Sequence, residues 1–298
     1  MLFASQNSSC LSGWLLLNKP VGVSSCQALR PLKKLYHTKR VGHCGTLDPF
    51  AEGLLLVVLG RATRLLPYTH HWYKRYELKI AWGLETTTGD LTGDVVAQSA
   101  HRPSPEAIYN ALPSFCGDIM QTPPAFSAVK VNGQRAYALA RKGEAPVLKA
   151  RKQHVRVFKL LACEKNWATF EVLCDRGTYV RALATDLATA LGTKGHLCQL
   201  KRTAIGPFEY PDALGLDFFE KTGQNEDALM HILRSPRALL DDIPELEVGQ
   251  TMALHLTQGR SVENVSCGQG LVFCLHQKTC VALARVEGSF LWPKVVFV

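Results

Sequence analysis

Short apolar runs separated by turn residues predict strands in the first two-thirds of the chain. The clearest run reads LLLVVL at residues 54–59 and begins directly after a glycine. Branched and aromatic residues bounded by Gly, Pro or charged residues are typical of strands. On this basis we predict strands at residues 15–17, 54–59, 76–82, 155–161 and 168–174.

One segment has the period of an amphipathic helix. Between residues 179 and 191, apolar side chains recur at spacings of three and four, which places them on one helical face. Thr178 is placed to cap the start of this helix, and Gly192 is placed to end it. Strands and a helix in one chain indicate the α+β class.

The balance of charge changes near residue 240. Residues 130–159 contain nine Lys or Arg and one acid, whereas residues 212–247 contain nine acids and three Lys or Arg. After this acidic stretch, strand-like runs return at residues 262–265, 271–275 and 281–286. We therefore predict a larger domain at residues 1–240 and a small β-rich module at residues 241–298.

The composition indicates a folded protein with an anionic partner. Of the 298 residues, 47% are hydrophobic, and the net charge of +9 favours a polyanion. The longest apolar runs fall far short of the roughly 20 residues that span a bilayer. The N-terminus lacks the basic start and apolar core of a signal peptide, so we expect a cytoplasmic protein.

The sequence carries no standard cofactor or metal signature. The patterns G-x-G-x-x-G, G-x-x-x-x-G-K-[ST] and H-E-x-x-H are absent, which weakens dehydrogenase, NTPase and metalloprotease interpretations. The ten cysteines include no Cys-x-x-Cys pair, and we expect most of them to be buried free thiols. Cys267, Cys274, His276 and Cys280 have irregular spacing for zinc, so we predict no metal site.

A glycine-rich loop holds the first candidate for chemistry. Residues 42–53 read GHCGTLDPFAEG, in which three glycines and a proline specify a tight, non-helical backbone. Asp48 lies directly before Pro49, which favours an extended conformation at the aspartate. Its carboxylate could be a rigidly held catalytic group, or it could simply cap its own turn.

Six ordered segments resemble the tRNA pseudouridine synthase B family, and the loop around Asp48 is similar to the family's signature. The segments are LNKPVGVSS (17–25), GHCGTLDPFAEGLL (42–55), KRY (74–76), QTPPAFSAVKVNGQRAYALARKGE (121–144), RGTYVRALATDLATALG (176–192) and LKRTAIGPF (200–208). Two positions depart from the usual pattern. Cys44 stands where a threonine is usual, and Phe50 stands where leucine is commoner.

The resemblance implies a fold and a reaction. The expected fold has a mixed, largely antiparallel central sheet with flanking helices, followed by a small RNA-binding (PUA-like) module. The expected activity is isomerisation of uridine 55 in the T-arm of tRNA to pseudouridine, and we expect a monomer. Since the base leaves C1′ through N1 and returns through C5, the stoichiometry requires no cofactor. Asp48 is the implied nucleophile, and the sequence leaves open whether it attacks C1′ or the base C6.

A nucleophilic carboxylate in a dry pocket needs a fixed cation, because desolvation raises its pKa. Arg181 would leave the first turn of the predicted helix, and an arginine can pair with a carboxylate at two points. The resemblance implies that Arg181 pairs with Asp48 and that Tyr76 stacks on the flipped uracil. Without the resemblance, an exposed helix arginine and a core tyrosine are the ordinary interpretations.

Five further residues are candidates for substrate binding. His43 is expected to stack on RNA bases, and Tyr179 is expected to line the pocket. Lys19 is expected to support the site structurally before any catalytic role. Lys130 and Arg141 belong to the basic segment, which suits phosphate contacts, and VKVNGQ at residues 129–134 predicts an exposed hairpin.

Two other functions are compatible with parts of the sequence. Asp90, in TTTGDLTGD, could join Asp48 as the acid and nucleophile of a glycosidase, but this loop composition indicates turn capping instead. A noncatalytic tRNA-binding or tRNA-folding protein would use the same basic face. Release of tritium from uracil C5 would separate isomerisation from binding alone.

Overall fold

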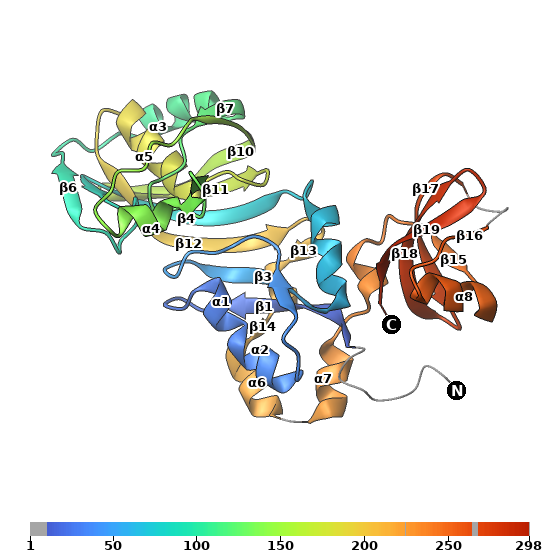
Figure 1. Cartoon of the computed structure of the whole chain (residues 1–298). Helices are drawn as coiled ribbons and strands as arrows, with labels where there is room; N and C mark the ends of the chain where they lie inside the picture. Colours follow the sequence, from blue (N-terminus) through green and yellow to red (C-terminus); the bar gives the residue numbers. More distant parts are fainter. Residues whose placement is uncertain (1–10, 224, 264–267, 298) are drawn as a thin grey trace.

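A long mixed sheet forms the centre of the structure (Figure 1). The computed structural model describes residues 11–223, 225–263 and 268–297, and ten strands of these residues form the sheet. The order along it is β14 (Leu214–Gly215), β1 (Ser12–Lys19), β3 (Glu52–Gly60), β12 (Gly195–Ile205), β4 (Lys74–Trp82), β11 (Trp167–Cys174), β10 (Arg151–Glu164) and β7 (Gly117–Gln121), with β2 (Val41–His43) beside β3 and β13 (Phe208–Glu209) beside β12.

The observed sheet confirms the expected fold class. The β1–β14 and β3–β12 pairs are parallel, and the other pairs among these ten described strands are antiparallel. The five strands predicted from apolar runs are confirmed, each inside a longer strand. The sequence pattern does not predict the central strand β12, because its residues GHLCQLKRTAI contain no apolar run.

Strand β3 is apolar on both faces because both faces are covered. Leu54, Leu56 and Val58 belong to an apolar cluster shared with the C-terminal module, whereas Leu55 and Val57 face a cluster formed with the helices. Alternate side chains of a strand point to opposite faces. The continuous run at residues 54–59 therefore reflects a strand between two cores.

Helices cover the two ends of the sheet (Figure 1). Helices α3 (Pro105–Ala111) and α5 (Val180–Ala190) lie at one end, and α1 (Ser25–Ala28), α2 (Arg30–Leu35), α6 (Leu216–Thr222) and α7 (Glu226–Ile232) lie at the other. Short 3-10 helices are η1 (Arg61–Thr69), η2 (Leu112–Phe115), η3 (Tyr210–Asp212) and η4 (Pro236–Leu239). None of the helices in the described ranges is long and apolar enough to cross a membrane.

Helix α5 forms where predicted, but Thr178 does not cap it. The N-cap residue is Tyr179, and its side chain makes no capping hydrogen bond. Gln121 of β7 satisfies the backbone here: the Tyr179 N–H donates to Gln121 Oε1 at 2.8 Å, and Gln121 Nε2 donates to the Tyr179 carbonyl at 3.1 Å. The prediction failed because a distant residue performs the capping. Gly192 ends the helix with a φ of 68°, as expected.

Two small hairpins project from the main sheet. Strands β5 (Leu84–Thr86) and β6 (Val95–Gln98) form one, and β8 (Lys130–Val131) and β9 (Gln134–Arg135) form the other. The second confirms the hairpin predicted from VKVNGQ. Its turn residues Asn132 and Gly133 have φ values of 49° and 83°, which a two-residue hairpin turn requires. Helix α4 (Ala136–Ala140) follows directly.

A second sheet forms the C-terminal part of the chain. Its order is β15 (Glu245–Glu247), β17 (Gly270–His276), β18 (Thr279–Glu287), β19 (Phe290–Val296) and β16 (Val262–Glu263), and α8 (Gln250–Thr257) packs against it. Two of the predicted tail strands are confirmed in β17 and β18; the third coincides with β16 only at residues 262–263, because residues 264–265 lie outside the described residues. The domain boundary at residue 240/241 stays a prediction.

The C-terminal sheet shares an apolar core with the main sheet. Phe273, Leu283 and Phe297 belong to the same buried cluster as Trp14 of β1 and Leu56 of β3. A module of about 50 residues buries too little surface to be very stable alone. We infer that its docking on β1 and β3 stabilises it.

We predict that Leu283→Ala lowers the free energy of unfolding by about 2–5 kcal/mol, because it leaves a cavity in the shared core. Leu283 is fully buried. Leu254→Ala is the matched control, since this leucine of α8 is 53% exposed, and its cost should stay below about 0.5 kcal/mol. Urea titration of both variants measures the difference. Equal losses would contradict the shared core.

Candidate active site

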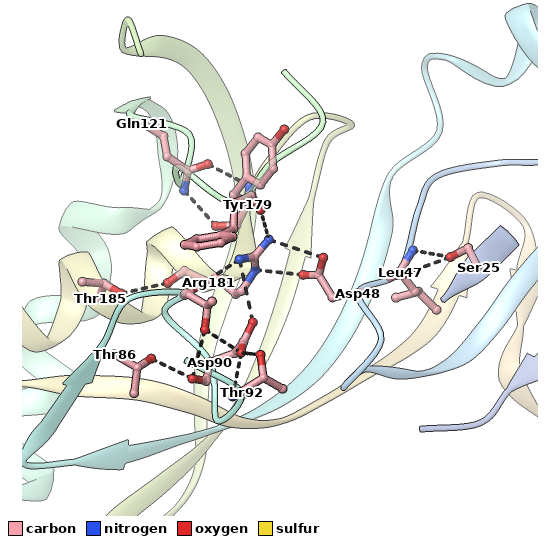
Figure 2. Close-up of polar contacts among 12 residues, drawn as sticks. Ser25, Leu47, Asp48, Thr86, Asp90, Thr92, Gln121, Tyr179, Arg181 and Thr185 are labelled. Carbon is pink, nitrogen blue, oxygen red and sulfur yellow. Dashed lines mark hydrogen bonds and ion pairs between the residues drawn. The ribbon is translucent and has the colours of Figure 1, made fainter. Parts of the chain in front are cut away.

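The loop that carries Asp48 is anchored on both sides of the aspartate. Before it, the Leu47 N–H donates to Ser25 Oγ at 2.8 Å, and Ser25 Oγ donates to the Leu47 carbonyl at 3.0 Å (Figure 2). After it, the Gly22 N–H donates to the Pro49 carbonyl at 2.8 Å. These contacts hold the carboxylate at a fixed place at the start of β3.

Arg181 meets Asp48 at two points. Arg181 Nε lies 2.8 Å from Asp48 Oδ2, and Arg181 Nη2 lies 3.3 Å from Asp48 Oδ1. The same guanidinium donates to the Thr88 carbonyl and the Phe126 carbonyl, each at 2.8 Å. Arg181 is buried, contrary to the interpretation of an exposed helix arginine. A buried guanidinium with this many acceptors has one orientation.

Asp90 is a second carboxylate beside the same guanidinium (Figure 2). Its Oδ1 accepts hydrogen bonds from Thr88 Oγ1, the Thr92 N–H and Thr92 Oγ1, which confirms the predicted turn capping. Its Oδ2 lies 3.7 Å from Arg181 Nη1. The sequence does not indicate this second contact, because the TTTGDLTGD composition explains the turn and carries no signal of a distant partner.

Burial and charge act on Asp48 in opposite directions. Burial raises the pKa of the Asp48 carboxyl, Arg181 lowers it, and Asp90 raises it again. The net direction is upward, although the side chain keeps 34% of its surface exposed. The carboxylate is thus partly stripped of water on one side and open on the other. Such a group is more reactive than a fully hydrated one.

Asp48 opens into a cavity of about 530 Å³. Tyr76 of β4 and Tyr179 at the start of α5 line this cavity together with Asp48 and Arg181. Tyr76 is buried, and burial raises its pKa to about 12. Its phenol therefore stays protonated at neutral pH, and the Arg202 guanidinium lies beside its hydroxyl. The structure brings the three predicted catalytic residues together.

His43 lines the same cavity from the end of β2. Burial lowers its pKa, and the Arg202 guanidinium lowers it further, so the imidazole is neutral at pH 7. Its Nδ1 is buried without a hydrogen-bond partner in the described part of the chain. A neutral ring in this place suits stacking better than ionic contact.

Lys19 supports the site from behind and does not line the cavity. It is fully buried, and its ammonium donates to the Pro20 and Val23 carbonyls at 2.8 Å and to the Pro49 carbonyl at 3.5 Å. Burial lowers its pKa to about 8, while the Asp48 carboxylate opposes the shift. The expected structural role agrees with this geometry. Direct substrate contact, which was also expected, does not agree with it.

Lys130 and Arg141 lie outside the cavity, on the exposed segment that begins at its rim. Phe126 and Ser127 line the cavity, and the Ser127 carbonyl accepts a hydrogen bond from the Tyr137 N–H of α4 at 3.0 Å. Lys130 in β8 and Arg141 after α4 are exposed. The structure thus separates these two cations from the buried residues and places them where a large partner could touch them.

Two buried cations of the cavity were missing from the predicted site. Lys74 of β4 and Arg202 of β12 both line it. Each lies within a motif that carried the family resemblance, in KRY and LKRTAIGPF. The motifs could have indicated them, but nothing in their spacing shows that they line the same cavity as Asp48.

The cysteines give no sign of a metal centre. Cys44, Cys174 and Cys280 are buried free thiols, and Cys274 is buried as well. No group of three His, Cys, Asp or Glu within the described ranges could hold a metal ion. Cys267, the first residue of the set that was considered for zinc, lies outside the described residues.

Comparison with known proteins gives consistent relatives. Residues 33–180 match the TruB family pseudouridylate synthase (N terminal domain), and residues 181–241 match the tRNA pseudouridylate synthase B C-terminal domain. The chain is 42% identical to tRNA pseudouridine synthase B of Bradyrhizobium diazoefficiens, covering 96% of this chain and 85% of the relative. It is 38% identical to that of Bartonella henselae, covering 96% of each.

Solved structures show the same fold. A structure described as a Cbf5-Nop10-Gar1 complex aligns with a TM-score of 0.70 at 24% identity, covering 98% of this chain and 86% of the other. An H/ACA RNP bound to a substrate RNA containing 2'-deoxyuridine aligns with a TM-score of 0.69 at 21% identity, covering 96% and 85%. With the family match and the sequence relatives, the chain belongs to the tRNA pseudouridine synthase B (TruB) family.

Proposed function

We propose that this protein isomerises uridine 55 in the T-arm of tRNA to pseudouridine, with Asp48 as the nucleophile. The observation that carries the proposal is the Asp48–Arg181 pair, which opens into a cavity that also holds the Tyr76 ring. The family membership supports the reaction and its tRNA substrate. The position in the T-arm and the role of Asp48 belong to the proposal. We further propose a cytoplasmic monomer.

The reaction exchanges one bond of ribose C1′ for another. The C1′–N1 bond breaks, the uracil turns, and a C1′–C5 bond forms. The proton on C5 is then lost, and N1 carries a proton in the product. Asp48 can divide this rearrangement into two easier steps by attacking either C1′ or the base C6. The contacts around Asp48 suit both routes, because they fix the carboxylate and leave one side open.

Arg181 keeps the nucleophile ionised and oriented. Burial alone would favour the protonated, unreactive carboxyl, and the two-point guanidinium contact opposes this. Asp90 holds the guanidinium from the opposite side, and its own position is held by Thr88 and Thr92. We propose that Asp90 is a positioning residue. The arginine can then turn neither toward solvent nor away from Asp48.

Tyr76 is suited to receive the uracil once it leaves the RNA stack. Its neutral phenol offers an aromatic face, and its hydroxyl can exchange a proton with the ribose or base. His43 and Tyr179 line the cavity beside it. We propose that His43 stacks on the bases next to the vacated position and that Tyr179 lines the pocket.

The exposed basic segment can hold the folded RNA around this site. Residues 130–159 carry nine Lys or Arg and one acid, and Lys130 and Arg141 are exposed. Cations on a hairpin and a short helix suit contacts with phosphates of a structured RNA arm. This segment alone would also favour a noncatalytic tRNA-binding or tRNA-folding role, so activity has to be measured directly.

Asp48→Asn should abolish tritium release from a T-arm RNA labelled at uracil C5, because an amide cannot act as the nucleophile. Binding of the RNA should change less than about threefold, since the isostere keeps the shape of the site. Asp94→Asn is the control, because Asp94 is exposed outside the cavity. Release of tritium at the wild-type rate by Asp48→Asn would disprove the nucleophile assignment. Wild type that binds without releasing tritium would support the noncatalytic role.

Arg181→Lys should reduce kcat on the order of 10²-fold or more, because one ammonium cannot make the two-point contact. Because the pKa of Asp48 is raised, the fall of kcat/KM at acidic pH should have its midpoint above pH 3.8, the ordinary aspartate value. We refer to this fall as the acid limb. Activity falls as pH falls, since only ionised Asp48 attacks. In Arg181→Lys this limb should move to higher pH. A limb that stays in place would count against the proposed role of Arg181.

Replacing Lys130 and Arg141 together with glutamine should weaken binding at low salt and flatten its salt dependence. Each lost phosphate contact should reduce the slope of log K against log salt by about 1. Lys165→Gln, on the turn between β10 and β11, removes a similar charge far from this segment. Fluorescence anisotropy with T-arm RNA at several salt concentrations gives the slopes. An unchanged slope would show that neither residue contacts an RNA phosphate.

A further inference from the structure

Two buried cations line the cavity, and neither forms an ion pair within the part of the chain that the structure describes. Lys74 is 5% exposed and Arg202 is 0% exposed, and both line the cavity. Arg202 Nε donates to the Leu54 carbonyl at 2.7 Å and Nη2 donates to the Gly45 carbonyl at 3.0 Å, whereas Nη1 is buried without a partner among the described residues. No hydrogen bond or ion pair joins the Lys74 ammonium to any other residue in the described ranges.

The two cations converge on one spot beside the Asp48 loop. A Cβ added to Gly45 would lie 3.6 Å from Lys74 Nζ, 2.8 Å from Lys74 Cε and 3.4 Å from Arg202 Nη1. Gly45 has a φ of 79°, so the loop needs glycine here for its conformation as well. Contacts this close leave no room for a side chain at Gly45, so the two cationic side chains pack directly against the loop here. This arrangement is a small cradle three residues before Asp48.

The charge around the cradle is not balanced within the protein. The acidic side chains that line the cavity are Asp48 and Asp175. Asp48 pairs with Arg181, and Asp175 accepts from Arg156 Nε at 2.8 Å. Neither is left to compensate Lys74 or Arg202. Burial lowers the pKa of Lys74, the nearby Cys44 thiol opposes this shift, and the Arg202 guanidinium lowers the pKa further. Unpaired buried charge is costly unless a bound anion compensates it.

We propose that Lys74 and Arg202 form a buried anion subsite that binds the backbone phosphodiester next to the flipped uridine. The inference rests on the proposed function, because it takes the RNA as the ligand. A phosphodiester carries a permanent negative charge and two exposed oxygens, so it can accept from both Lys74 Nζ and Arg202 Nη1. A neutral uracil carbonyl would leave the two positive charges uncompensated.

The subsite would give the extruded nucleotide a second fixed point. Tyr76 belongs to the same strand as Lys74, two residues along, so the side chains of both line the cavity from one face of β4. With the phosphodiester held at the cradle and the base held by Tyr76, the ribose between them has limited freedom. Such positioning lowers the entropic cost of bringing C1′ or C6 to Asp48.

The test combines Lys74→Met with an RNA in which one phosphodiester is replaced by a neutral methylphosphonate. Two RNAs carry the replacement on the 5′ or the 3′ side of the target uridine. We expect each single change to weaken binding about 10-fold or more for one of the two RNAs. For that RNA, the Lys74→Met protein should bind the methylphosphonate RNA no more weakly than it binds the unmodified RNA. It should also bind that RNA no more weakly than wild type does. The subsite predicts this non-additivity, because both changes remove one contact.

Fully multiplicative losses with both RNAs would overturn the subsite. They would indicate that the two cations contact the base instead of a phosphate, for example by stabilising a departing uracil anion. Because this cycle measures binding, it stands apart from the tritium assay. If wild type releases no tritium but the two binding losses are non-additive, the proposed function is overturned and the subsite stands. If wild type releases tritium and the two binding losses multiply, the proposed function stands and the subsite is overturned.

Two controls separate phosphate binding from a structural role. Lys165→Met removes one exposed charge elsewhere and should leave the methylphosphonate effect unchanged. Lys74→Met should not lower the melting temperature, because it removes a charge that burial disfavours. A large loss of stability would assign Lys74 to structure and contradict the subsite. Arg202→Lys, which keeps a cation, should retain part of the non-additivity, and complete loss of the non-additivity with intact folding and binding would contradict the subsite.

Discussion

The site depends on one buried arginine that joins three separate segments. Arg181 contacts Asp48 in the loop before β3, Asp90 in the turn between β5 and β6, and the Phe126 carbonyl after β7. A buried guanidinium is stable only when its N–H groups find acceptors, so these segments have to meet at α5. The constraint that stabilises this part of the fold is therefore the same one that orients the proposed nucleophile.

The central strands supply the rest of the cavity. Strands β4 and β12 are adjacent and antiparallel, and they contribute Lys74, Tyr76, Leu200 and Arg202 to its lining. Apolar clusters pack on both sides of the sheet, so its centre is rigid and water is excluded around the cavity. A rigid, partly dry site explains why the pKa of Asp48 is raised while that of Lys74 is lowered: burial disfavours both charges. The Asp48 carboxylate has its counterion inside the protein, whereas no ion pair to the Lys74 ammonium exists among the described residues.

The C-terminal sheet does not contribute to this cavity, but it completes the hydrophobic core of the larger sheet. Its residues Phe273, Leu283 and Phe297 pack with Trp14 and Leu56. The 3-10 helix η1 adds Ala62 and Leu65 to this cluster and contacts both β3 and β19. Docking of the module therefore supports the site indirectly, by keeping β3 in place.

The sequence by itself determined the strands with continuous apolar runs, the helix at residues 180–190, the hairpin at Asn132–Gly133 and the loop around Asp48, because local composition and spacing decide these features. It left out β12, which has no apolar run and buries the charged Arg202, and it assigned the helix cap to Thr178 instead of Gln121. Motif resemblance named Asp48, Tyr76 and Arg181. Only the tertiary structure decided that Asp90 shares Arg181 and that Lys74 and Arg202 converge at Gly45. Burial, pairing and desolvation arise between residues far apart in the chain, and local spacing carries no information about them.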